Sequence, residues 1–137
     1  MNNPLRIMID ANILISAIFF TNEKFDRLFQ TIFDKHNLVI SSYVINELID
    51  VAQRKFPNRI SVLDKVLANM PYELVYTPLE LPPDLFEIRD PDDYPVLYTA
   101  ITEDIDILIT GDKDFSDIRI KRPILLTPAQ FIKKYAN

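Results

Sequence analysis

The chain has 137 residues, of which 48% are apolar and 26% charged, a composition typical of one folded domain rather than of a disordered chain. It contains no cysteine, which excludes disulfides and thiolate metal sites. The net charge of −5 argues against a broadly basic nucleic-acid surface, because such affinity comes mainly from Lys and Arg. We therefore expect a single domain spanning residues 1–137.

The first segment, from Leu5 to Ile15, is strongly apolar but is interrupted by Asp10 and Asn12. No uninterrupted apolar run reaches the roughly 18 residues that a membrane span needs, and no small-residue cleavage site follows. This pattern predicts a cytoplasmic protein without a membrane segment or signal peptide.

Short apolar runs alternate with helical patterns along the rest of the chain. In chain order we expect a strand at 7–9, helices at 13–17 and 25–33, a strand at 38–40, helices at 45–56 and 60–70, a strand at 74–76, a helix at 96–101, strands at 107–109 and 124–126, and a helix from 128. The stretch 77–91 contains four prolines, which indicates an extended connection. The alternation predicts an α/β domain with a small, mainly parallel sheet flanked by helices.

Acidic side chains follow two of the expected strands. Asp10 comes directly after the strand at 7–9, and Asp112 and Asp114 follow the strand at 107–109. The carboxyl ends of parallel strands meet at one edge of the sheet, where ligands bind in such folds. We therefore expect these carboxylates to lie near one another.

Two further acids belong to helices. Glu47 falls in about the first turn of the helix after the strand at 38–40. Asp93 precedes the apolar residues of the helix expected at 96–101, at spacings that place it on the buried face of that helix. Because Pro95 disfavours helical geometry at Tyr94, a helix that begins only at Pro95, with Asp93 just outside it, is the alternative.

Oxygen ligands of this kind suit Mg²⁺ or Mn²⁺ rather than zinc. The sole histidine, His36, lies in a polar stretch before a strand, where we expect a surface residue. A cluster of carboxylates around such ions can activate water for phosphodiester attack. Each acid has an ordinary explanation as well, as a helix cap, a helix-dipole partner or a turn residue. Four of them at matching strand ends favour a shared site.

Five segments resemble the PIN domain family, and specifically its subfamily of VapC-like toxin components of toxin–antitoxin systems. They are DANILISA (10–17), VINEL followed by RKF (44–48 and 54–56), RDPDD (89–93), TGDKDF (110–115) and LTPAQF (126–131). Their order and context extend the resemblance over nearly the whole chain.

The resemblance implies a Mg²⁺- or Mn²⁺-dependent endoribonuclease acting on single-stranded RNA. Its catalytic acids would be Asp10, Glu47, Asp93 and Asp112, with Asp114 a further metal ligand. Asn12, Ser16 and Thr110 would orient carboxylates or water. Relatives of this kind form homodimers and are inhibited by an antitoxin protein. Lys113, Arg54 and Lys55 are the candidates for phosphate contacts, and Asp92 or Asp90 is an alternative to Asp93 as the third acid.

Two other functions fit parts of the pattern. A catalytically inactive PIN-like binding module would keep the fold without the chemistry, and divalent-metal binding through Asp10 and Asp112 separates it from the nuclease. A phosphotransfer domain would use Asp10 after the first strand. It is disfavoured because Asn12 stands where a second acid is expected.

Overall fold

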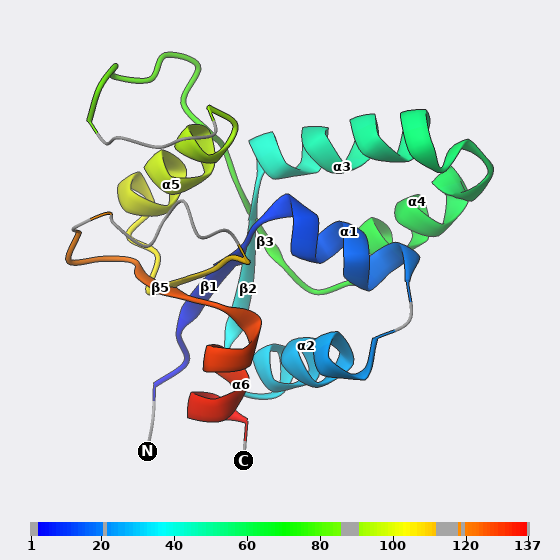
Figure 1. Cartoon of the computed structure of the whole chain (residues 1–137), viewed down its shortest axis with the longest axis horizontal. Helices are drawn as coiled ribbons and strands as arrows, with labels where there is room; N and C mark the ends of the chain where they lie inside the picture. The colour runs from blue at the N-terminus through cyan, green and yellow to red at the C-terminus, as the bar shows by residue number, and fades with distance from the viewer. Residues whose placement is uncertain (1–2, 21, 86–90, 112–117, 119, 137) are drawn as a thin grey trace.

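Five short strands form one parallel sheet in the order β3-β2-β1-β4-β5 (Figure 1). The structure is a computed structural model that describes residues 3–20, 22–85, 91–111, 118 and 120–136. The strands are β1 (Arg6–Ile9), β2 (Asn37–Ser41), β3 (Glu73–Val75), β4 (Ile107–Ile109) and β5 (Ile124–Leu126). All five strands expected from the sequence are present, and the predicted α/β fold class is confirmed.

The described helices flank this sheet. They are α1 (Ala11–Phe19), α2 (Glu23–Lys35), α3 (Ser42–Lys55), the short 3₁₀ helix η1 (Pro57–Arg59), α4 (Ile60–Asn69), α5 (Asp93–Thr102) and α6 (Pro128–Tyr135). Figure 1 shows α2 beside α6, and α5 beside the first turns of α3. No helix among the described residues is long and apolar enough to cross a membrane.

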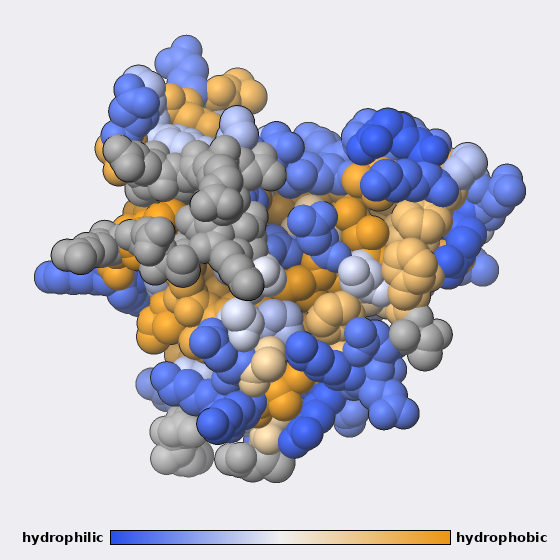
Figure 2. Space-filling view, in the orientation of Figure 1, coloured by the Kyte–Doolittle hydropathy of each residue, from blue (hydrophilic) through white to orange (hydrophobic). Residues whose placement is uncertain are grey.

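The core lies on the three central strands. Residues 7–9 of β1, 38–40 of β2 and 107–109 of β4 are all 2% exposed or less. Strands covered on both faces read as continuous apolar runs, because neither face meets water. In Figure 2, apolar surface crosses the middle of the viewed face over α1, while hydrophilic side chains cover α3 above it and α2 below.

Short polar side chains cap the amino ends of several helices. Asp10 caps α1, Asn22 caps α2 and Ser41 caps α3, each accepting a backbone N–H of the first turn. Thr127 forms a capping box with Gln130 at the start of α6. These caps satisfy amide groups that have no partner within the helix.

Helix α5 begins earlier than the alternative in which Pro95 starts it. Its first residue is Asp93, with Pro95 at the third position. A proline is tolerated there because the first-turn amides have no intrahelical acceptor to lose. Glu47 lies one turn deeper than expected, since α3 starts at Ser42 and makes Glu47 its sixth residue.

The strand order reverses beside β1. The chain passes from β1 to β2 and β3 on one side, then crosses to β4 and β5 on the other. Ligands of open parallel sheets bind beyond the carboxyl ends of the strands at such a switch point. Here that point lies between β1 and β4, the strands that lead into Asp10 and Thr110.

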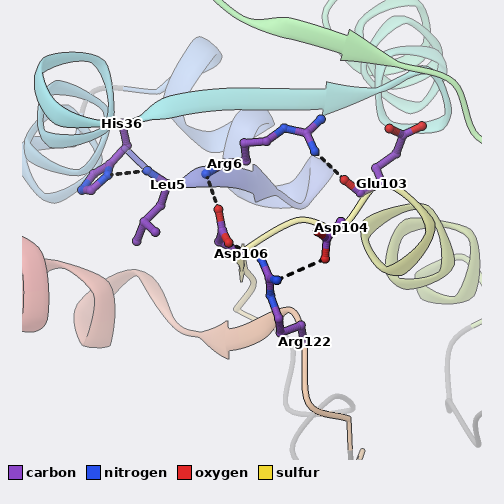
Figure 3. Close-up of polar contacts among 7 residues, drawn as sticks. All are labelled: Leu5, Arg6, His36, Glu103, Asp104, Asp106 and Arg122. Carbon is purple, nitrogen blue, oxygen red and sulfur yellow. Dashed lines mark hydrogen bonds and ion pairs between the residues drawn. The ribbon is translucent and has the colours of Figure 1, made fainter. Parts of the chain in front are cut away.

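The opposite edge of the sheet is fixed by a polar network (Figure 3). The Asp106 carboxylate accepts the backbone N–H of Arg6 at 2.8 Å and also the Arg122 guanidinium, which lies 3.2 Å from Asp104. The Arg6 side chain pairs with Glu73 at 2.8 Å. Two arginines are therefore used to join the amino ends of β1, β3, β4 and β5.

His36 is half-buried rather than a simple surface residue. Its Nδ1 accepts the N–H of Leu5 at 3.1 Å (Figure 3), and its ring stands edge-on to Phe131 and Tyr135 of α6. Burial lowers the pKa of His36, and the neighbouring Lys35 lowers it further. The sequence did not reveal this position, because α6 comes from the far end of the chain.

Candidate active site

Asp10 is held in place on both carboxylate oxygens at the end of β1. It is 8% exposed. Its Oδ1 accepts the N–H of Ile13 at 3.0 Å, and its Oδ2 accepts the hydroxyl of Thr110 at 2.6 Å. Ile9 pairs with Ile109 across the strands, so Asp10 and Thr110 occupy the next positions in register. Asp10 therefore caps α1, as one of the explanations considered from the sequence predicts, and the same contact orients its carboxylate at the switch point.

A hollow of about 260 Å³ opens beside this carboxylate. Asn12 and Ser16 lie four residues apart on α1, which places them on one face of the helix. Each carboxylate oxygen has more than one lone pair, so the contacts to Asp10 do not exhaust its capacity to bind a cation. The hollow is lined by Asp10, Asn12, Ile13, Ser16, Phe25 and Gly111.

Glu47 and Asp93 lie on neighbouring helices near the same edge. Glu47 is half-buried in the second turn of α3, and Asp93 is half-buried at the start of α5. The Oδ2 of Asp93 is itself buried. Helices α3 and α5 contact each other. The topology therefore brings Glu47 and Asp93 onto adjacent elements.

The predicted metal cluster extends beyond the described residues. Asp112, Lys113, Asp114 and the alternative Asp90 all lie outside them. Within the part of the chain that the structure describes, no three Asp, Glu, His or Cys side chains gather closely enough to hold a metal ion. Asp10, Asn12, Ser16 and Thr110 are brought together, whereas the full acidic quartet remains a prediction.

The candidate phosphate contacts on α3 lie at the carboxyl end of that helix. Arg54 and Lys55 are in the last turn of α3, and Arg54 pairs with Asp50 at 2.9 Å. Arg54 is seven residues beyond Glu47, or about 10 Å along the axis at 1.5 Å per residue. The two basic side chains are therefore about two turns of α3 beyond Glu47.

The sequence matches a family model for the PIN domain over residues 6–114, which is most of the chain. This chain belongs to the PIN domain family. The family resemblance and the fold expected from the five motifs are thus confirmed. No protein with a curated description matches the chain.

A solved structure supports the same architecture for this PIN domain. The chain is similar to one in the crystal structure of VapBC2 from Rickettsia felis bound to a DNA fragment from their promoter, with a TM-score of 0.73 and 24% identity. The match covers 90% of this chain and 98% of the other. At that identity, the likeness establishes a shared fold.

Two residues of the PIN domain's site region were not singled out from the sequence. Phe25, the first residue of the helix expected at 25–33, lines the hollow. Tyr43 stands four residues before Glu47, and its hydroxyl donates to the Asp92 carboxylate at 2.9 Å. The i, i+4 spacing on α3 was the available signal for Tyr43. Nothing in the local pattern of Phe25 distinguishes it from its core neighbours.

The donor chemistry of this region fits a hard divalent cation. Asp10, Glu47, Asp93, Asn12 and Ser16 offer oxygen ligands or oxygen hydrogen-bond partners. Mg²⁺ and Mn²⁺ favour such oxygen sets and commonly keep several waters. The carboxylate of Asp10 is moreover fixed before any ion arrives, which lowers the ordering cost of binding.

Proposed function

We propose that this PIN domain is a Mg²⁺- or Mn²⁺-dependent endoribonuclease that cleaves single-stranded RNA. The observation that carries the proposal is the buried carboxylate of Asp10, held by Thr110 and the Ile13 amide at the switch point of a parallel sheet. A carboxylate oriented in this way beside a hollow still has lone pairs that can bind a cation. Membership of the PIN family supports a nuclease role for this site.

The proposed metal ligands are Asp10, Glu47, Asp93 and Asp112, with Asp114 as a further ligand. When bound, the cation would supply an activated water and stabilise charge on the phosphate. Thr110 and the Ile13 amide keep Asp10 in one orientation. Asn12 and Ser16, on the same wall of the hollow, would hydrogen-bond to water or to a phosphate oxygen.

In this proposal, RNA binding depends on a few basic side chains. Lys113, beside Asp112 in the sequence, is the candidate contact for the phosphate at the cleavage site. Arg54 and Lys55 would contact a more distant phosphate, given their place at the end of α3. A net charge of −5 gives little nonspecific attraction, so the substrate should be recognised by shape and sequence more than by charge.

We also propose that the protein is the toxin of a toxin–antitoxin pair, acting as a homodimer in the cytoplasm and inhibited by an antitoxin protein. The motif resemblance to VapC-like toxins and the fold shared with a chain of the VapBC2 structure support this role. An inactive PIN-like binding module is the second candidate. It predicts the same partner surfaces but neither metal binding nor cleavage.

The experiment is cleavage of end-labelled single-stranded RNAs by the purified chain with Mn²⁺, with Mg²⁺ and with excess EDTA. The nuclease proposal predicts cleavage that either ion supports and EDTA stops. The Asp10→Asn variant purified in parallel controls for contaminating ribonuclease and should be at least 100-fold slower. Cleavage that persists in EDTA or in Asp10→Asn would contradict the proposal.

A further inference from the structure

We propose that Tyr43 and Asp92 position the third acid of the site, and that this acid is Asp93 rather than Asp92. The inference rests on the proposed metal site. It assigns different roles to two consecutive aspartates: Asp92 receives the Tyr43 hydroxyl, and Asp93 is directed to the cation. Tyr43 acts through Asp93 and is a positioning residue.

The contact joins two elements that carry candidate acids. The Tyr43 hydroxyl, in the first turn of α3, donates to Oδ1 of Asp92 at 2.9 Å, and Asp92 is the N-cap residue of α5. Figure 1 shows the start of α5 beside the start of α3. The hydrogen bond therefore fixes the first turn of α5, where Asp93 lies, against the helix that carries Glu47.

Helical spacing separates the two roles. Tyr43 and Glu47 are four residues apart on α3 and so share a face. Asp92 and Asp93 are consecutive, and neighbouring helical positions differ by about 100° around the axis. Asp92 is exposed and engaged with Tyr43, whereas Asp93 is half-buried with its Oδ2 enclosed. We therefore assign cation binding to Asp93, whose Oδ2 is enclosed, and assign to Asp92 the role of accepting the Tyr43 hydroxyl.

Other contacts hold the rest of α5, so the Tyr43–Asp92 hydrogen bond acts locally. The Ser42 hydroxyl accepts the N–H of Thr77 at 2.9 Å, and the Thr77 hydroxyl accepts a hydrogen bond from Thr99 at 2.8 Å. Thr99 is fully buried two turns into α5. Loss of the Tyr43 hydroxyl should therefore loosen the first turn of α5 without detaching the helix.

The test is calorimetric titration of Mn²⁺ into the full chain, with melting of each variant measured in EDTA. Tyr43→Phe removes only the hydroxyl and should weaken Mn²⁺ binding about tenfold, the lower end of the range for residues that orient metal ligands. Tyr76→Phe is the matched control, because Tyr76 is 71% exposed, and its affinity should stay within twofold of the wild type. Both variants should melt within about 2 °C of the wild type in EDTA.

Variants of the two aspartates distinguish the proposed metal ligand, Asp93, from the hydrogen-bond acceptor of Tyr43, Asp92. Asp92→Asn keeps an oxygen that can accept from Tyr43 and should bind Mn²⁺ within about twofold of the wild type. Asp92→Ala should weaken binding as Tyr43→Phe does, and the double variant should be no weaker than either. Asp93→Asn should reduce affinity at least 30-fold.

Two results would overturn the assignment while leaving the nuclease proposal standing: Asp92→Asn losing Mn²⁺ while Asp93→Asn keeps it, or Tyr43→Phe binding like the wild type. A wild-type chain that binds no Mn²⁺ would instead contradict the metal site itself, and the inference with it.

Discussion

The hydroxyl of Thr110 donates a 2.6 Å hydrogen bond to Oδ2 of Asp10, and it joins the carboxyl ends of β4 and β1 where the strand order reverses. Both residues are buried. Replacing Thr110 with Val keeps its methyl group and puts a second methyl group in place of the hydroxyl donor. Loss of a donor to a buried oxygen costs about 1–3 kcal/mol, which should be measurable as a lower free energy of unfolding in urea.

Thr110→Ser is the control for this prediction, because it retains the hydroxyl and deletes one methyl group. It should lose less stability than Thr110→Val and should keep more of its Mn²⁺ affinity. A larger loss of stability in Thr110→Ser than in Thr110→Val would mean that packing of the methyl group, not the hydrogen bond, makes Thr110 important.

Two substitutions of Asp10 should distinguish its role in catalysis from its role in folding. Asparagine retains an oxygen that can cap α1, so Asp10→Asn should unfold within about 1 kcal/mol of the wild type while losing RNA cleavage. Asp10→Ala also removes the cap and should cost a further 0.5–2 kcal/mol or so. Urea unfolding and cleavage assays on both variants check this. Collapse of the fold in Asp10→Asn would assign the residue a structural role alone.

Substitutions at the opposite edge of the sheet should change the stability of the chain without changing catalysis. Asp106 accepts the N–H of Arg6 and the Arg122 side chain, so Asp106→Ala should destabilise the chain by about 1–3 kcal/mol. Asp104 meets Arg122 with its side chain 79% exposed, and such exposed pairs contribute about 0–1 kcal/mol. In urea, the free energy of unfolding of Asp106→Ala should therefore be well below that of Asp104→Asn. The per-molecule cleavage rate of the folded fraction should not change in either.

His36 predicts a pH dependence of stability. Its pKa is lowered from the ordinary 6.5 by burial and by Lys35, so the unfolded chain binds the proton more tightly than the folded one. Stability contributed by neutral His36 is therefore present above about pH 6.5 and declines as pH falls below it. Protonated Nδ1 also cannot accept the Leu5 amide.

His36→Gln isolates that contribution, because the other titrating groups are shared with the wild type. Free energies of unfolding measured from pH 7.5 to 5.0 should fall more steeply in the wild type than in His36→Gln. Parallel curves would show that His36 does not contribute to the pH dependence.

Much of the fold could be predicted because its signals are local. The apolar runs at 7–9, 38–40 and 107–109 are buried on both faces, so their sequence alone identifies them as central strands. The weak strand at the edge, β3, was predicted near its true position as well. The placement of Asp10 at the carboxyl edge followed from the chain order of strands and helices.

What could not be predicted depends on contacts between distant segments. The Asp10–Thr110 and Tyr43–Asp92 hydrogen bonds span 100 and 49 residues. His36 looked solvent-exposed because α6, which covers it, comes about 95 residues later. The sequence does not decide whether α5 starts at Asp93 or at Pro95. The rule that proline disfavours a helix does not apply in the first turn, because the amides there have no acceptor within the helix.

The most direct test of the account is calorimetric titration of Mn²⁺ into wild type, Asp10→Asn and Asp112→Asn, with Asp104→Asn as the matched control from the opposite edge. A metal site at the carboxyl edge predicts saturable binding in the wild type and in Asp104→Asn, and at least a 30-fold loss of affinity in the other two. Equal binding in all four proteins, or none in the wild type, would contradict a metal site at the carboxyl edge of this sheet.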